Sequence, residues 1–327
     1  MSKFSDIIKE IEKAESIAVF VHVNMDGDAV GSAFSFANAL KDFGKEARVV
    51  LNDNPPPYLR YFADEYVTEA EEVFDLAVAL DCGDMARLGC CREIFERAKR
   101  HVCIDHHVSN VGYGDINYIY AKASSTSEII YELIMELTGK ISARQAEQLY
   151  AGIITDTGGF KFSNTTPESF LYSAKLLECG ADISRVCIEI YECESLGKLK
   201  LKSKALDSLK LYAGGKISSV ILTEKDFEET GTGFSDCEGF SEIGRSVDGV
   251  EAAFSITVKK QIKVSLRSKS YVDVSRVASH FGGGGHVRAS GFTLPCDADV
   301  EKLTDELVEL LEKEITEHEN ERSNSNR

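Results

Sequence analysis

The first half of the chain alternates between short apolar runs and longer stretches with helical periodicity. The apolar runs are continuous, as expected for parallel strands that are covered on both faces. The stretches between them place apolar residues three and four positions apart, which is typical of amphipathic helices. This rhythm predicts a doubly wound, mainly parallel α/β sheet. Strands are predicted at 17–23, 47–51, 76–80 and 102–104, and helices at 32–43, 93–99, 129–137 and 143–154.

The pattern changes near residue 190, where a lysine-rich segment, GKLKLKSKALDSLKLY, predicts a helical connector. A strand at 217–222, a hairpin from 250–258 and 262–266, a short helix at 274–281 and a strand at 291–294 predict a smaller α/β domain with a final helix. The polar ending EHENERSNSNR predicts a disordered tail. The expected parts are a first domain at 1–190, a helical linker at 191–213, a second domain at 214–315 and a disordered tail at 316–327.

Length and composition indicate a globular protein of two domains. The 327 residues are 43% hydrophobic and 28% charged. Charges interrupt the first 16 residues, so this stretch predicts an amphipathic helix and not a secretory signal. The apolar runs are too short to cross a bilayer. Nine cysteines without a CxxC pair favour reduced thiols. We therefore expect a cytoplasmic protein that does not bind membranes.

The net charge of −17 limits the kind of nucleic acid that the chain can bind. Proteins that bind long nucleic acids usually present a basic track, because phosphate contacts dominate their affinity. We therefore expect no long nucleic acid as a partner. An anionic substrate should be small, or be attracted by local cations such as bound metal ions.

The segment VFVHVNMDGDAVGS places His22 at the end of a predicted strand and Asp26 and Asp28 on the loop that follows. Two carboxylates about 4 Å apart repel each other by roughly 4 kcal/mol at an effective dielectric constant of about 20. A divalent cation removes this cost, and a histidine completes a mixed nitrogen and oxygen site. The alternative is a solvated Asp-Gly-Asp turn. An EF-hand is excluded because its closing glutamate is missing, and a phosphate-binding P-loop because its lysine is missing.

Three further polar motifs follow core elements. Asp81 ends an apolar strand, Asp105, His106 and His107 end the next, and Asp156 ends a mostly apolar helix. A single aspartate at a strand end is ordinarily a helix cap. Together these residues indicate one crevice, because the carboxyl ends of parallel strands share an edge of the sheet.

So many charges in one crevice predict two metal ions. Within the Asp-His-His motif we expect His106 to be a metal ligand and Asp105 to accept from its ring and fix its tautomer. We expect His107 to face the substrate.

The motifs HxNxDxD, a lone Asp, Asp-His-His and TDTG together resemble the DHH phosphoesterase family, and FGGGGHVRASGF at 281–292 resembles its DHHA1 domain. The resemblance implies hydrolysis of phosphate esters with manganese, and catalytic roles for His107, Asp105 and Asp81. It also implies two ion sites that share Asp81, one with His22, Asp26 and Asp81 and the other with Asp28, Asp81, His106 and Asp156.

The resemblance further implies that the second domain binds substrate against the first. The glycine run would bring backbone N–H groups close to phosphate. A flexible linker is the alternative for this run, but it lies between a predicted helix and a predicted strand. The implied substrate-binding residues are Asn24, Arg267, Gly283, Gly284, Gly285 and His286.

Within the family, the chain is most similar to small two-domain enzymes that degrade very short RNA and dephosphorylate 3′-phosphoadenosine 5′-phosphate (PAP). It lacks the nucleic-acid-binding domain of RecJ-like exonucleases, and manganese pyrophosphatases have a different second domain. The expected partner is therefore a short RNA or a small nucleotide, and the resemblance implies a homodimer. Two alternatives stay open: a phosphodiesterase for cyclic or linear di-AMP, and a non-catalytic nucleotide sensor.

Overall fold

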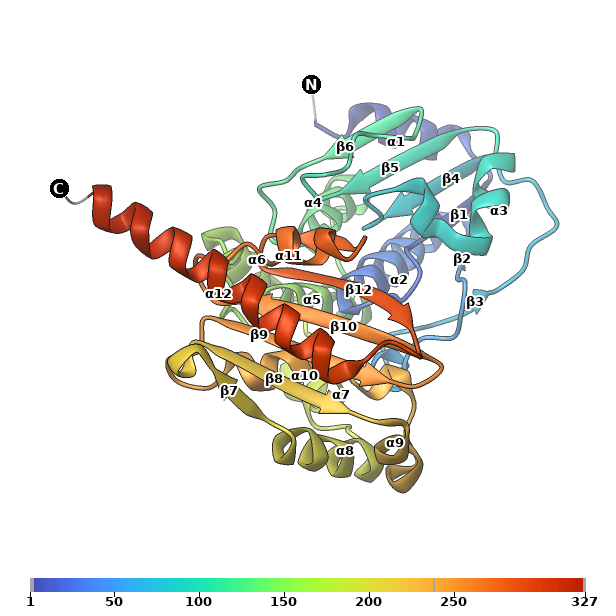
Figure 1. Cartoon of the computed structure of the whole chain (residues 1–327). Helices are drawn as coiled ribbons and strands as arrows, with labels where there is room; N and C mark the ends of the chain where they lie inside the picture. The colour runs from blue at the N-terminus through green and yellow to red at the C-terminus, as the bar shows by residue number, and fades with distance from the viewer. Residues whose placement is uncertain (1–2, 238, 326–327) are drawn as a thin grey trace. The chain divides into compact units, whose positions relative to one another are not determined.

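The computed structural model describes residues 3–237 and 239–325. The chain forms two compact units, unit 1 at Met1–Cys193 and unit 2 at Glu194–Arg327. Figure 1 shows the elements of each unit. Among the described helices, none has both the length and the hydropathy needed to cross a membrane.

Unit 1 is built on a six-stranded sheet in which every pairing is parallel, in the order β3-β2-β1-β4-β5-β6. The strand order reverses beside β1, so a crevice is expected beyond the carboxyl ends of β1 and β4. This arrangement confirms the predicted doubly wound α/β sheet. The strands are β1 (Ser16–Phe20), β2 (Glu46–Val50), β3 (Tyr66–Val67), β4 (Leu76–Leu80), β5 (His101–Asp105) and β6 (Ile116–Ile119).

Five helices of unit 1 begin after a residue whose side chain accepts from a free backbone N–H group. The Ser125 side chain accepts from the Glu128 N–H at the start of α4, and Ser142 forms a capping box with Gln145 at the start of α5. The helices are α1 (Ser5–Lys13), α2 (Gly27–Asp42), α3 (Arg92–Arg97), α4 (Thr126–Thr138), α5 (Ala143–Asp156), α6 (Pro167–Glu178) and α7 (Ile183–Tyr191), with 3₁₀ turns η1 (Pro57–Leu59) and η2 (Met85–Cys91).

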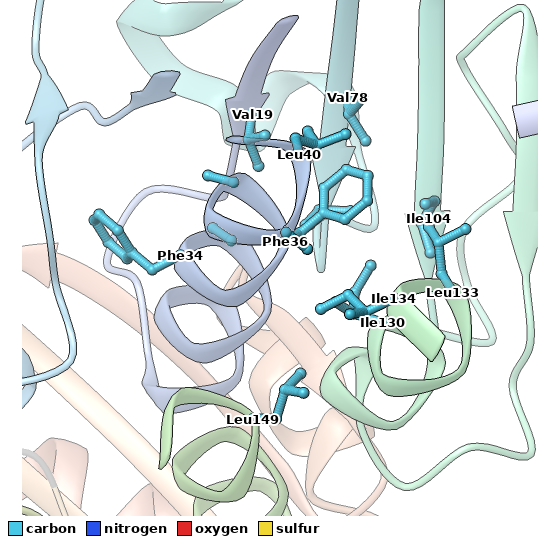
Figure 2. Close-up of a cluster of buried hydrophobic side chains, with 14 of the residues drawn as sticks. Val19, Phe34, Phe36, Leu40, Val78, Ile104, Ile130, Leu133, Ile134 and Leu149 are labelled. Carbon is cyan, nitrogen blue, oxygen red and sulfur yellow. The ribbon is translucent and has the colours of Figure 1, made fainter. Parts of the chain in front are cut away.

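The larger core of unit 1 lies between the sheet and helices α2, α4 and α5, and a smaller cluster that includes Phe20 and Phe95 lies on the opposite face of the sheet. Figure 2 shows Val19 and Val78 of adjacent strands beside Leu40 and Phe36 of α2. All four side chains are buried. The apolar runs of the sequence therefore become the sheet surface on which these helices pack, and the polar residues at their ends stay at the edge.

Two glycines let the helices of unit 1 approach closely. A Cβ on Gly31 of α2 would clash with the backbone of Gln148 in α5. A Cβ on Gly152 of α5 would clash with Ser127 of α4 and would lie 2.8 Å from an Asp28 carboxylate oxygen. Close packing of α2, α4 and α5 therefore fixes the position of Asp28.

Unit 2 contains a mixed sheet in the order β11-β12-β10-β9-β8-β7, in which only β8 and β9 pair in parallel. The predicted hairpin is confirmed, because β9 and β10 pair antiparallel. The strands are β7 (Lys210–Tyr212), β8 (Ile217–Leu222), β9 (Ala252–Val258), β10 (Gln261–Ser268), β11 (Gly284–His286) and β12 (Ala289–Pro295). The helices are α8 (Leu196–Asp207), α9 (Glu224–Thr230), α10 (Phe240–Arg245), α11 (Val274–His280) and α12 (Val300–Ser325), with 3₁₀ turns η3 (Ala213–Gly215) and η4 (Phe234–Cys237).

Three segments of unit 2 differ from the sequence predictions. The end of the expected helical connector is strand β7, which pairs with β8. Part of the glycine run is strand β11, which pairs with β12. Helix α12 continues to Ser325, where a disordered tail was expected, because Ile315 is buried and the His318 ring stacks on Tyr271. In each case a tertiary or sheet contact outweighs the local composition.

Candidate metal centre

Eight ionisable residues of unit 1 come together beyond the carboxyl ends of β1, β4 and β5 and at the ends of α2 and α5. We call them the polar cluster: His22, Asp26, Asp28, Asp81, Asp105, His106, His107 and Asp156. Their candidate ligand atoms form three groups, each within 4.8 Å: His22 with Asp26 and Asp81; Asp28 with His106 and Asp156; and Asp81 with Asp105, His106 and His107. The predicted convergence of these residues is therefore present in the fold.

Asp81 lies between two of these groups. Its Oδ2 is 3.6 Å from His22 Nε2, and its Oδ1 is 3.5 Å from His106 Nε2. Thr126 donates to Oδ1 from its hydroxyl at 3.0 Å. The residue has a φ of +53°, an unfavourable value for a side chain with a Cβ, of the kind that clusters at functional sites. Its two oxygens thus face two different histidines.

The side chain of Asp28, in α2, is buried against the amino end of α4. Its carboxylate accepts from the backbone N–H groups of Thr126 at 2.6 Å and Ser127 at 2.8 Å. Burial, and then the charges of Asp81 and Asp156, raise the pKa of Asp28 well above its usual range. Two amide donors therefore do not offset the crowding of negative charge, and the arrangement favours a bound cation.

Asp156, at the end of α5, is also surrounded by like charges. Its Oδ2 lies 3.6 Å from His106 Nε2. Burial and the nearby Asp81 raise the pKa of Asp156 well above its usual range.

His22 and Asp26 hold the amino end of α2 against the cluster. Asp26 caps α2 by accepting from the backbone N–H groups of Asp28 and Ala29, each at 3.1 Å. His22 Nε2 is 3.7 Å from Asp26 Oδ2. Burial alone would lower the pKa of His22, but Asp26 and Asp81 raise it to about 10. The surroundings of His22 thus strongly favour positive charge.

The Asp-His-His motif differs from the prediction in one contact. Asp105 was expected to fix the ring of His106, but its Oδ1 accepts from His107 Nδ1 at 2.8 Å. His106 Nδ1 instead faces the Ala123 carbonyl oxygen at 3.4 Å. The reason is backbone geometry, because the Asp105 carboxylate turns back to accept from the N–H groups of His106 and His107. The hydrogen bond to Asp105 raises the pKa of His107.

Several residues that support the cluster were not predicted from the sequence. Asn110 donates to Asp105 Oδ2 at 2.7 Å, and its position just after the motif was the only available signal. Asn164 donates to the Asp156 carbonyl oxygen at 3.1 Å, and Thr126 contacts Asp81. Arg87 lies beside His22, with Nη2 3.1 Å from Nδ1. These contacts join segments that are distant in sequence, so no local pattern indicates them.

The residues of the polar cluster fit divalent metal ions. Asp28 and Asp81 are only 1% and 2% exposed, and both lie within reach of further carboxylates and imidazoles. Isolated buried carboxylates are costly, whereas carboxylate and imidazole together are a common ligand set for divalent ions. The cluster could therefore hold metal.

The residues expected to bind substrate fall in both units. In unit 1, Asn24 is exposed on the loop after β1, with a φ of +55°. In unit 2, Arg267 lies on β10 and forms an ion pair with Glu242, with Nε 2.7 Å from Oε1. His286 is exposed on β11.

The glycines of the run have separate structural reasons. A Cβ on Gly283 would clash with Gly291 and Phe292, and one on Gly285 would approach Ala289 and Ser290. Gly284 instead faces open space. Gly283 and Gly285 are therefore needed for the close approach of β11 and β12, and the backbone of Gly284 stays accessible.

Comparisons with known proteins agree with this architecture. The model of the DHH family, N-terminal domain, matches residues 16–153, and that of the DHHA1 domain matches residues 227–316. A protein of Thermus thermophilus named bifunctional oligoribonuclease and PAP phosphatase NrnA is 31% identical, over 97% of this chain and 94% of that protein. A Bacillus subtilis protein of the same name is 30% identical, over 94% of this chain and 98% of that protein.

Among solved structures, an exopolyphosphatase-related protein from Bacteroides fragilis matches with a TM-score of 0.88 and 26% identity, over 96% of this chain and 98% of that one. The sequence matches extend through both units. The chain belongs to the DHH family and carries a DHHA1 domain in its second half.

Proposed function

We propose that this protein is a metal-dependent phosphoesterase that hydrolyses short oligoribonucleotides and removes the 3′-phosphate of PAP. Its relatives from Thermus thermophilus and Bacillus subtilis carry both activities in their names. The observation that carries the proposal is the convergence of the polar cluster at the carboxyl edge of a parallel sheet. A buried group of carboxylates and imidazoles suits phosphoryl chemistry, in which negative charge must be neutralised.

We propose that the cluster binds two manganese ions. His22, Asp26 and Asp81 would hold one ion, and Asp28, Asp81, His106 and Asp156 the other. The two Asp81 oxygens that face His22 and His106 support a shared ligand. When bound, such ions act as Lewis acids and lower the pKa of water.

The remaining groups would position and protonate the substrate. Asp105 holds the His107 ring and raises its pKa, which favours the imidazolium form. A protonated His107 can donate to a phosphate oxygen, so we assign it a catalytic role, with Asp105 as its positioning residue. Asp81 is assigned as catalytic because it would contact both ions.

Unit 2 would bind the nucleotide. The backbone of Gly283, Gly284 and Gly285, with His286 and Arg267, would contact phosphate, and Asn24 would contribute from unit 1. Arg267 would have to exchange Glu242 for the substrate. We propose that residues 1–190 form the catalytic part, 191–213 the linker and 214–315 the substrate-binding part. We also propose a cytoplasmic homodimer that acts on small nucleotides and not on long nucleic acid.

A substrate panel tests the proposal. Purified protein with manganese should release mononucleotides from di- to pentaribonucleotides and phosphate from PAP. The panel should include cyclic di-AMP and linear diadenylate, because faster turnover of these would favour the alternative phosphodiesterase. Nucleotide binding without hydrolysis of any substrate would favour a sensor.

A further inference from the structure

Arg87 is held beside the polar cluster by a rigid turn. The 3₁₀ turn η2 is capped by Asp84, and the Val23 N–H donates to the Arg87 carbonyl oxygen at 2.8 Å. Gly89 has a φ of +58°, and a Cβ there would clash with Asn52 and Val23. The turn therefore packs tightly on the loop after β1, and this packing fixes the backbone position of Arg87.

Arg87 and His22 lie at hydrogen-bond distance, but both groups are donors at the point of contact. His22 Nδ1 lies 2.8 Å from the Val23 carbonyl oxygen and 3.1 Å from Arg87 Nη2. A carbonyl oxygen only accepts, so Nδ1 carries the proton and Nε2 faces Asp26 and Asp81. A guanidinium has donors only, so Arg87 meets another donor at this point.

Within the described chain, Arg87 has neither an acceptor at hydrogen-bond distance nor a carboxylate within 4.0 Å. The side chain is exposed at the rim of the cluster. Arg267, in contrast, is already paired with Glu242. Arg87 is thus a cation beside the cluster whose charge no neighbour neutralises.

We propose that Arg87 is a substrate-binding residue of unit 1 whose guanidinium binds a phosphate group of the nucleotide at the polar cluster. This assignment rests on the proposed function and adds to it a phosphate-binding cation supplied by the DHH domain. Arginine suits the role because its planar fork can bind two phosphate oxygens at once. A phosphate also supplies the acceptor that Arg87 lacks.

The test measures binding without turnover. A diribonucleotide with a non-hydrolysable methylenephosphonate linkage is titrated into the manganese-loaded full-length protein by calorimetry, at several salt concentrations. We expect Arg87→Gln to raise Kd by about 10- to 100-fold. The slope of log K against log salt concentration should become shallower by about 0.7. Arg87→Lys should fall between, because lysine keeps the charge but not the fork. The matched control is Arg92→Gln, which removes an exposed arginine on α3 that pairs with Glu96, and it should stay within about twofold.

The metal content of each variant, measured by mass spectrometry, separates binding from structure. Wild-type metal content together with weakened nucleotide binding supports the assignment. An unchanged Kd, or a loss of metal whose effect on Kd disappears at saturating manganese, overturns it, because Arg87 would then act only on His22. Failure of the wild type to bind either the analogue or PAP overturns the proposed function itself, and the assignment with it.

Discussion

The two units of the molecule treat buried charge in opposite ways. In unit 2, Glu251 is 6% exposed, and its carboxylate accepts from the backbone N–H groups of Ser270, Tyr271 and Val272 and from the Ser270 hydroxyl. In unit 1, Asp28 has two amide donors but faces the charges of Asp81 and Asp156. A buried carboxylate with a full set of hydrogen bonds stabilises the fold, whereas crowded buried carboxylates favour the binding of a cation.

The pKa values of the carboxyl groups follow this difference. Burial alone would raise the pKa of Glu251, but its backbone donors lower it. Burial and like charges both raise the pKa of Asp28 and Asp156. The two units therefore bury the same kind of group, and its neighbours decide whether the group stabilises the fold or binds a ligand.

The largest expected effect comes from breaking the unit 1 cluster at its centre. Asp81→Asn removes the charge between the groups of His22 and His106 and should lower kcat on a diribonucleotide by on the order of 1,000-fold. The same change should abolish the rise in Tm that manganese gives to the wild type. Asp53→Asn, at an exposed site in the same unit, is the control. Wild-type turnover by Asp81→Asn would remove the two-ion proposal.

The second effect is a pH dependence that changes sign with metal. Folding raises the pKa of Asp28 and Asp156, so their contribution to stability is complete at low pH and is lost as the pH rises through the raised values. His22, raised from 6.5 to about 10, adds a loss above pH 6.5. With a chelator, the free energy of unfolding, and Tm with it, should therefore fall as the pH rises above 3.8, with a further fall above pH 6.5. The expected slope is up to about 1.4 kcal/mol per pH unit for each group.

With saturating manganese the trend should disappear or reverse, because metal ligands must be deprotonated to bind. Thermal unfolding followed by circular dichroism with and without chelator checks both limbs. Parallel curves in the two conditions would show that the cluster is not neutralised by metal.

The third prediction addresses the satisfied carboxylate of unit 2. Glu251→Gln replaces a charged acceptor of four hydrogen bonds and should lower the free energy of unfolding of unit 2 by about 1–3 kcal/mol. Amide hydrogen exchange can locate the loss, and protection should decrease around β9 and β10 while unit 1 keeps its protection. Glu224→Gln, at the first turn of α9, is the matched control. An equal loss in both variants would mean that charge in general matters and not this network.

The smallest effect is expected at the ion pair of Arg267. Glu242→Gln frees the guanidinium, and if Arg267 binds phosphate, the KM for PAP should fall by up to about fivefold. Burial would raise the pKa of Glu242, but Arg267 lowers it, so the pair is intact at neutral pH. The double variant Glu242→Gln with Arg267→Gln should lose this gain. An unchanged KM in both would assign Arg267 to structure alone.

The four central strands of the unit 1 sheet and the members of the polar cluster could be predicted from the sequence, whereas the edge strands β3 and β6 were not predicted. Short continuous apolar runs are typical of strands that are covered on both faces, and a charge at the end of such a run is costly to bury in the core. The strand at 76–80 was predicted with the bounds that β4 has, and Asp81 follows it at once. Asp81 and the Asp105–His107 motif could be placed together because parallel strands share one carboxyl edge.

Which atoms of these residues contact one another could be seen only in the folded chain. The partner of Asp105 is His107 and not His106, because the direction of a side chain depends on how the backbone leaves the strand. The strand β11 in the glycine run and the helical end of α12 depend on neighbours that no local pattern names. Arg87 gave no signal in its own segment, because its importance comes from a turn that packs against Val23 from 64 positions away in the chain (87 − 23 = 64). Local propensity fixes elements, but contacts between distant segments follow from packing, which a single sequence does not display.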